Sequence, residues 1–164
     1  MQLSTKKLLQ ESMIWLILIV VTYIITTIYD NNKPENRIYN SYQKTYEYLV
    51  EAQNYEKSNM VEVQEVLDMG RAEIKKIKNK VKLNEEMGSK FDGISIQFDI
   101  LQEKIISEAT EKIKKLQKEK LEGKNYSNTM KEIDNLIKSL ESGESKRAKS
   151  ASENLKKIIK GIGL

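Results

Sequence analysis

Residues 13–29 read MIWLILIVVTYIITTIY, a run of seventeen residues without a charged side chain. At ~1.5 Å of rise per residue, a helix of this run is about 25 Å long, close to the hydrocarbon thickness of a bilayer. Aromatic residues lie near both ends of the run, as they do at membrane interfaces. The run therefore predicts a single-pass transmembrane anchor with membrane lipid as its partner. We expect its lipid-facing residues to include Met13, Trp15, Leu16, Ile19, Tyr23, Ile28 and Tyr29.

Two other interpretations of the run are a cleaved signal peptide and a buried core helix. A signal peptide has a shorter apolar region and small residues at its cleavage site, but this run ends at residues 25–29 without an Ala-x-Ala pattern. A core helix of a soluble domain would show polar positions every third or fourth residue. The anchor is the favoured interpretation.

The charges that flank the run bear on its orientation. Lys6 and Lys7 stand together in the short polar tail, residues 1–12, whereas the residues after the run carry both basic and acidic side chains. Short basic tails favour the cytoplasmic side, and long domains are exported with little regard to their charge. We therefore expect the N-terminus inside the cell membrane and the following domain outside the cytoplasm.

The composition of the chain excludes several classes of function. The 164 residues carry 28 Lys and Arg against 24 Asp and Glu, a mixed surface rather than a strongly basic one. Three Arg residues stand against 25 Lys residues, which disfavours bidentate recognition of phosphates or bases. We expect no nucleic-acid partner.

His and Cys are both absent from the sequence. This removes general-base catalysis by His, thiol nucleophiles, disulfides and the common structural zinc sites. Acidic pairs occur along the chain, but no pattern places one in an apolar pocket. We therefore expect no enzyme, no catalytic or metal-binding residue and no cofactor, and we do not expect a small-molecule ligand.

The rest of the chain is almost continuously helical in pattern. Residues 30–36 form a polar linker in which Pro34 can open the next helix, and residues 37–164 form one helical domain. Gly-containing breaks, including a turn over residues 84–92, divide this domain. We expect its helices at about 35–57, 59–86, 91–122, 127–142 and 146–164, the fourth opening either at Ser127 or with a capping box of Thr129 and Glu132.

Apolar residues recur along these helices at steps of three and four. The predicted buried stripes are Tyr39, Tyr42, Tyr46 and Leu49; Val63, Leu67, Gly70, Ile74, Ile77 and Val81; Ile94, Phe98, Leu101, Ile105, Ala109, Ile113 and Leu116; Tyr126, Met130, Ile133, Ile137 and Leu140; and Ala148, Ala151, Leu155, Ile158 and Ile162. Gly70 is the one exception to the apolar seam of the second helix.

Long helices with one apolar face must pack against neighbours. The fold class is therefore all-α: one N-terminal transmembrane helix followed by an antiparallel four-helix bundle whose fourth member is broken near Gly143, or a long coiled coil between chains. A basic tail, a membrane helix and a four-helix bundle together resemble, in plan, the ligand-binding half of bacterial chemoreceptors. That resemblance implies a sensory or accessory subunit with a ligand site in the bundle.

Two groups of side chains are candidates for contact with other molecules. Exposed Tyr residues at Tyr39, Tyr48 and Tyr55 can form a protein-interaction surface, although scattered surface aromatics need no function. The C-terminal helix, residues 146–164, is basic and amphipathic, which is typical of helices that lie on anionic membranes and also of a last bundle helix with solvated Lys residues. Its candidate membrane-surface residues are Lys156, Lys157, Ile159, Lys160 and Ile162.

The expected function is that of a single-pass membrane-anchored helical scaffold. Its helical domain would bind a protein partner or a second copy of itself. The alternative is the sensory subunit with a ligand-binding bundle.

Overall fold

The computed structural model describes residues 2–56 and 59–163, which form six α-helices and no strand. This confirms the all-α class. The chain divides into two compact units, Met1–Asn40 and Ser41–Leu164.

The first unit consists of α1 (Gln2–Asn32) and the first turns of α2 (Pro34–Tyr55). Most of the predicted linker is helical, and the chain bends at Lys33 alone. Pro34 opens α2, as predicted, because a proline lacks only an N–H that would have no partner in the first helical turn. The amide of Asn36 donates to the backbone oxygen of Asp30 (2.7 Å) across the bend.

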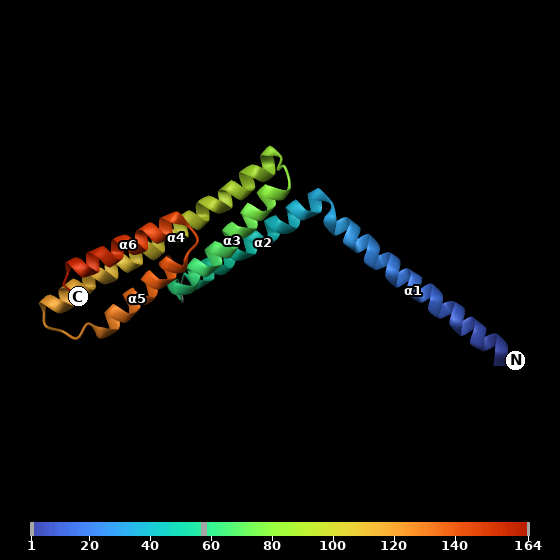
Figure 1. The fold of residues 1–164 in the computed structure, drawn as a ribbon, viewed down its shortest axis with the longest axis horizontal. Helices are drawn as coiled ribbons and strands as arrows, with labels where there is room; N and C mark the ends of the chain where they lie inside the picture. The colour runs from blue at the N-terminus through green and yellow to red at the C-terminus, as the bar shows by residue number, and fades with distance from the viewer. Residues whose placement is uncertain (1, 57–58, 164) are drawn as a thin grey trace. The chain divides into compact units, whose positions relative to one another are not determined.

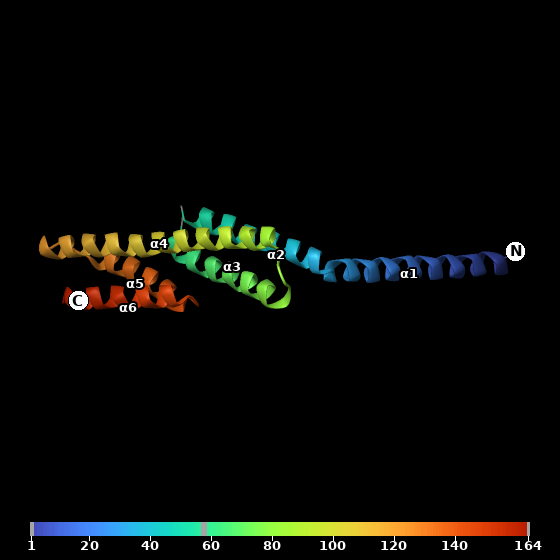
Figure 2. The same ribbon diagram turned by 90° about the horizontal axis from the view of Figure 1, so that it is seen from above.

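The second unit is built around α4 (Glu85–Leu121), a helix of 37 residues. Figures 1 and 2 show α2 and α3 (Met60–Lys80) beside its N-terminal half, and α5 (Ser127–Ser142) and α6 (Lys146–Gly161) beside its C-terminal half. The five helices therefore form two groups of three that share α4. A helix of this length, about 55 Å, is long enough to serve both groups.

Ion pairs and ring contacts give the direction of each helix relative to α4. Tyr42 contacts Phe91, and Glu56, directly after α2, pairs with Lys104. Both pairs follow the same order along the two helices, so α2 is parallel to α4. Pairs of α3 with α4 run in opposite order (Arg71 with Asp99, Lys78 with Asp92), so that α3 is antiparallel. Residues of α6 follow the direction of α4, from Arg147 beside Glu103 to the Ile162 oxygen beside Lys120.

The predicted single fourth helix, broken near Gly143, is wrong. Helices α5 and α6 contact each other and both contact α4, so the chain reverses between them. Gly143 adopts an extended conformation (φ −60°, ψ 141°) that ends α5, and the Ser145 hydroxyl accepts from the Ala148 N–H (3.0 Å) to open α6.

The predicted stripes of the second and third helices are buried. On α4 all seven predicted residues lie in the core. On α3 the five from Val63 to Ile77 are buried, including Gly70, over which the ring of Phe98 lies. The exception is Val81, which lies beyond the end of α3 in extended conformation.

The predicted Tyr stripe of α2 is wrong. The buried residues of α2 are Ser41, Thr45, Leu49 and Ala52, whereas Tyr42 is half-buried and Tyr46 is 48% exposed. The Ser41 hydroxyl donates to Glu73 Oε1 (2.8 Å) and the Thr45 hydroxyl to the backbone oxygen of Ser41 (2.7 Å). Since these hydroxyls have partners, the small polar face can be buried against α3 without a large penalty.

The connection between α3 and α4 also differs from the prediction. Helix α3 ends at Lys80 rather than near residue 86, and α4 begins at Glu85, so Gly88 and Gly93 lie inside a helix instead of a turn. Asn84 sets this boundary because its side-chain oxygen accepts from the Met87 N–H (2.8 Å).

The ends of the last three helices follow the sequence more closely. Gly123, with φ of +63°, terminates α4 at the predicted break. Helix α5 begins at Ser127, one of the two predicted starts, and the capping box is absent because Thr129 is buried within the helix. On α6 the buried residues are Ala148, Ser152, Leu155 and Ile159, so the predicted Ala151, Ile158 and Ile162 lie beside the buried face rather than on it.

Candidate membrane anchor and interaction surfaces

The apolar part of α1 is exposed along its length. Among the residues that the structure describes, one helix is long and apolar enough to cross a membrane, Ser12–Asn32, and none of its most apolar window is buried. A signal sequence near an N-terminus satisfies the same test of length and composition. All seven predicted anchor residues are more than half exposed: Met13, Trp15, Leu16, Ile19, Tyr23, Ile28 and Tyr29.

Two threonine hydroxyls in this segment bond to the backbone of their own helix. Thr26 Oγ1 donates to the backbone oxygen of Thr22 (2.8 Å), and Thr27 Oγ1 donates to that of Tyr23 (2.8 Å). A polar group without a partner would be costly in hydrocarbon, whereas a hydroxyl bonded to its own helix is tolerated. These two threonines are therefore compatible with an apolar surrounding.

Polar side chains gather where the apolar segment ends. The Lys33 ammonium pairs with Asp30 Oδ1 (2.6 Å) and lies 5.4 Å from the centre of the Tyr29 ring. The Asn32 amide donates to the backbone oxygen of Ile28 (2.9 Å). An aromatic ring beside charged groups is the composition found at a membrane–water interface.

The three predicted interaction tyrosines do not form one exposed cluster. Tyr39 is exposed and belongs to the first unit, whereas Tyr48 and Tyr55 are half-buried in the second. The Lys44 ammonium lies 5.9 Å from the centre of the Tyr48 ring. The negative charge of Glu62, with that of Glu51, raises the pKa of the Tyr55 hydroxyl.

The predicted membrane-surface residues of α6 are divided between its two faces. Ile159 is buried, Ile162 is half-buried, and Lys156, Lys157 and Lys160 are exposed. Lys156 pairs with Glu141 of α5 (2.7 Å). Because Ile159 packs inside the unit, it cannot also insert into a membrane surface without leaving the core.

The C-terminal end of α6 does not lie at the end of the unit where α2 enters it. The end of α6 lies beside Lys120, whose ammonium donates to the Ile162 oxygen (2.7 Å). The start of α2 in this unit lies at the other end of α4, where Tyr42 contacts Phe91 edge-on at 5.8 Å. Helix α6 therefore runs away from Ser41 instead of returning to it, so the packing favours the last-helix interpretation.

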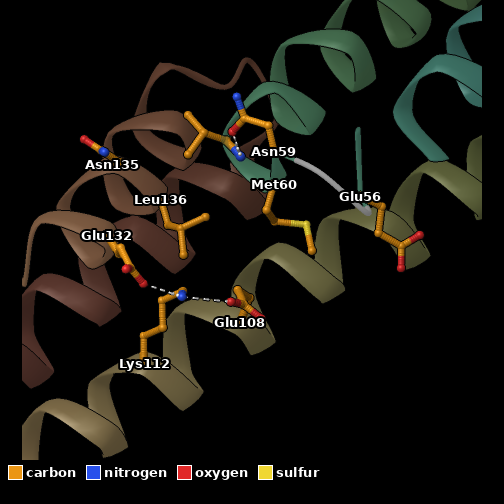
Figure 3. Close-up of a pocket in the computed structure, with 9 residues that line it drawn as sticks. Glu56, Asn59, Met60, Glu108, Lys112, Glu132, Asn135 and Leu136 are labelled. Carbon is orange, nitrogen blue, oxygen red and sulfur yellow. Dashed lines mark hydrogen bonds and ion pairs between the residues drawn. The ribbon is translucent and has the colours of Figure 1, made fainter. Parts of the chain in front are cut away.

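A pocket of about 360 Å³ opens between α3, α4 and α5 (Figure 3). Its central feature is Lys112, whose ammonium pairs with Glu132 (2.6 Å) and Glu108 (3.1 Å). The hydrogen bond to Glu132 raises the pKa of Lys112, and the same bond lowers the pKa of the Glu132 carboxyl. The other lining residues are Glu56, Asn59, Met60, Val61, Asn135 and Leu136.

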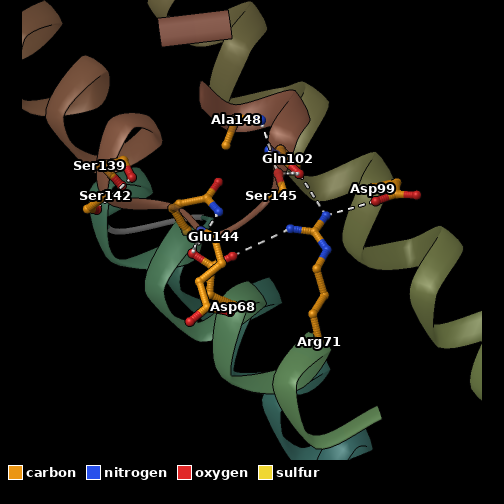
Figure 4. A network of polar contacts seen from close by, with 10 residues as sticks. Asp68, Arg71, Asp99, Gln102, Ser139, Ser142, Glu144, Ser145 and Ala148 are labelled. Carbon is orange, nitrogen blue, oxygen red and sulfur yellow. Dashed lines mark hydrogen bonds and ion pairs between the residues drawn. The ribbon is translucent and has the colours of Figure 1, made fainter. Parts of the chain in front are cut away.

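A polar network joins α3 and α4 to the turn between α5 and α6 (Figure 4). Gln102, which is fully buried, donates from Nε2 to the Ser145 hydroxyl (2.9 Å) and accepts at Oε1 from Arg71 Nη2 (2.7 Å). Asp68 Oδ2 accepts from the Gln64 amide (3.1 Å) and from the backbone N–H of Glu144 (3.2 Å).

The sequence does not indicate this network, in which the side chains of Gln64 and Gln102 are buried. Gln64 and Gln102 each follow a predicted core residue, Val63 and Leu101, and so lie at the edge of the apolar stripe. Since Gln is common on exposed helix faces, nothing in the local sequence marks these two as buried.

No protein family, no curated protein and no solved structure matches this chain.

Proposed function

We propose that this chain is a single-pass membrane-anchored interaction protein that presents a helical unit to a protein partner or to a second copy of itself. The observation that supports the proposal is the apolar segment of α1, which is long enough to cross a membrane and of whose most apolar window no residue is buried. An exposed apolar helix of this length is strongly unfavourable in water, so it needs lipid or a protein to cover it.

The helical unit supports an interaction role more than a chemical one. Hydrogen bonds of its polar network join α3 and α4 to the turn between α5 and α6, so these groups serve to hold elements of the fold together. What the unit offers to other molecules is its helix surfaces.

Fractionation of cells that express the full chain tests the anchor. We expect the chain in the membrane fraction, resistant to high salt and alkaline carbonate and released by detergent. Replacing both Ile19 and Val20 by Lys should shift it towards the soluble fraction, because a Lys at the centre of a membrane helix costs about 2.5–3.5 kcal/mol on the insertion scale. The matched control is Lys at Asn32 and Asn36, beyond the apolar run.

The mass of the membrane-bound chain separates an anchor from a signal sequence. An uncleaved chain of 164 residues supports the anchor. A chain that is shortened by the apolar segment and recovered in the soluble fraction contradicts the proposal.

A second candidate function, a ligand-binding sensory subunit, draws on the pocket around Lys112. Its volume of about 360 Å³ is at the lower end of the range for small-molecule sites, and its ammonium and carboxylates could orient a polar ligand. A small molecule that raises the melting temperature of the full chain, and no longer does so after Lys112→Met, would favour this function. Recovery of a membrane protein by crosslinking, with no stabilising ligand, would favour the first.

A further inference from the structure

Helix α4 carries exposed apolar residues on the face opposite its core stripe. Ile96 is 59% exposed and Ile100 is 45% exposed, whereas Phe98 between them is fully buried. At ~100° of turn per residue, each isoleucine lies about 160° around the helix axis from Phe98. Two large aliphatic side chains are thus presented together on the outer surface of α4.

These residues belong to a row of exposed positions along one side of α4, of which Glu103 pairs with Arg147 of α6 (2.8 Å). Outward positions on α4 recur at steps of 4, 3, 4, 3 and 4, and all of them are exposed: Ser89, Gly93, Ile96, Ile100, Glu103 and Ser107. Such spacing aligns residues along one side of a helix and is the pattern of a two-stranded coiled coil. We call these six residues the outer seam.

Gly93 lies in the outer seam without a reason inside the chain. A Cβ added there would meet no atom within 4 Å, and its φ is not in the left-handed region. Glycine in an exposed helix interior costs about 0.5–1 kcal/mol relative to alanine. Having no side chain, Gly93 leaves room for another helix to approach closely beside Ile96.

The charges that flank the outer seam select the partner and its direction. On one flank, the residues before Gly93 and Ile100 are acidic (Asp92 and Asp99), Glu85 lies one heptad earlier, and Ile106 precedes Ser107. The other flank carries Lys90, Gln97 and Lys104. In a parallel pair, residue i of the first flank lies near residue i+5 of the second flank of the other chain, which pairs Glu85 with Lys90 and Asp99 with Lys104. An antiparallel pair centred on Ile96 and Ile100 would place Asp99 beside Asp99 of the other copy.

We propose that the outer seam docks on the same seam of a second copy of this chain, with the two α4 helices parallel. Four flanking residues already have intrachain partners: Lys90 with Glu86 (2.6 Å), Asp92 with Lys78 (2.7 Å), Asp99 with Arg71 (2.8 Å) and Lys104 with Glu56 (2.6 Å). The four side chains are about half exposed or more, and a carboxylate has two oxygens and an ammonium three donors, so an interchain pair can be added to an existing one.

This inference rests on the proposed function, because the seam has only two large apolar residues per copy. Such a contact is weak between freely diffusing molecules. Two copies anchored in one membrane share their orientation and are held at a high effective concentration, which strengthens a weak parallel contact without any new interaction.

Disulfide crosslinking of the full chain in membranes tests the proposal, since the natural sequence has no Cys. In a parallel pair each seam residue meets its own copy, so Ser89→Cys and Ser107→Cys should each form a dimer on mild oxidation. The matched control is Ser150→Cys on α6, which is equally exposed but off the seam. We expect at least five-fold more dimer at 89 and 107 than at 150.

Two outcomes would overturn the proposal. Equal yields at 89, 107 and 150 would mean that the copies are merely crowded in the membrane. A dimer that forms only when the Ser89→Cys and Ser107→Cys chains are mixed would mean an antiparallel pair centred on Ile96 and Ile100.

A second variant separates the contact from the fold. Adding Ile96→Lys to the Ser107→Cys chain should lower the crosslinking yield at least five-fold while the melting temperature stays unchanged, because Ile96 is exposed in the single chain. An unchanged yield would contradict the proposal. Loss of the membrane fraction itself would instead refute the anchor, which the fractionation experiment detects separately.

Discussion

At the scale of single residues, a few positions carry constraints that their residue type alone does not reveal. Gly70 interrupts an apolar seam in the sequence, and the structure explains it: a Cβ at this position would lie 2.3 Å from Cζ of Phe98. Gly143 is similar, because a Cβ there would lie 2.8 Å from Nε2 of Gln64. In both places the missing side chain lets a neighbouring element approach.

Gly70→Ala should therefore destabilise the protein by about 1–3 kcal/mol, the usual cost of overpacking a core. Gly88→Ala is the matched control: Gly88 also lies in a helix, but a Cβ there meets nothing within 4 Å, so this change should be neutral or stabilising by up to about 1 kcal/mol. Urea unfolding measures both. Equal effects of the two changes would mean that Phe98 does not lie over Gly70.

At the scale of helices, hydrogen bonds between side chains fix which elements pack and in what register. The α5–α6 turn is tied to α4 through Gln102 and Ser145, and to α3 through Asp68 and the Glu144 N–H. Two helices packed through apolar stripes can shift by one turn at small cost in free energy. A buried hydrogen bond does not allow this shift, because its donor and acceptor meet in one register only.

Gln102→Leu should loosen the α5–α6 hairpin from the rest of the unit. The change leaves the Ser145 hydroxyl without Gln102 and costs about 1–3 kcal/mol. Hydrogen exchange should accelerate over residues 140–150 more than over the N-terminal half of α4. Gln117→Leu, on the exposed face of the same helix, is the control and should leave the exchange pattern intact. Uniform acceleration throughout the unit would argue against a local clamp.

The contact of α2 with α3 predicts a pH dependence. Burial raises the pKa of the Glu73 carboxyl, but hydrogen bonds from Ser41 and Lys76 outweigh it, so that the pKa of Glu73 lies below its ordinary value of 4.5. The ionised form is therefore favoured by folding. Its stabilising contribution is fully present above the unfolded-state pKa and is lost as the pH falls through the lower, folded-state pKa.

Urea unfolding at pH 7 and at pH 3 measures this contribution. The wild-type chain should lose more stability between the two than Glu73→Gln does, because the amide does not titrate. Glu153→Gln is the control. Because Glu153 is exposed on α6, this variant should lose as much stability between pH 7 and pH 3 as the wild-type chain does. If Glu73→Gln and the wild type lost the same stability, the Ser41–Glu73 bond would not hold the carboxylate.

At the scale of the whole molecule, the chain combines an exposed apolar segment in its first unit with a second unit that buries its own core. The two parts make different physical demands: the apolar segment of α1 needs a low-dielectric surrounding, and the charged surface of the second unit needs water. A membrane-anchored protein satisfies both.

We predict that the N-terminus lies inside the cell and the helical unit outside. A membrane-impermeant maleimide should label Ser150→Cys on intact cells, and should label Ser4→Cys only after lysis. The physical reason is the pair Lys6 and Lys7 in a short tail, which favours retention on the cytoplasmic side. The reverse pattern of labelling would reverse the orientation.

The sequence by itself determined the helical class, most of the helix boundaries and the buried stripes of α3 and α4, because a stripe of large apolar residues at steps of three and four can only be buried on one side of a helix. It also determined the apolar anchor candidate, since length and absence of charge are local properties.

Only the tertiary structure decided what depends on partners distant in the chain. The prediction of a buried Tyr stripe on α2 was wrong because it followed the largest apolar side chains. The buried face instead carries the small hydroxyl residues Ser41 and Thr45, which let α2 lie closer to α3, where Ser41 bonds to Glu73. The helical state of Gly88 and Gly93 and the reversal of the chain at Gly143 follow from capping by Asn84 and from packing against α4. The burial of Gln64 and Gln102 could not be predicted from the sequence either. Hydrophobic periodicity shows which face of a helix is apolar, whereas the polar hydrogen bonds that orient the helices depend on the geometry of the neighbouring helix.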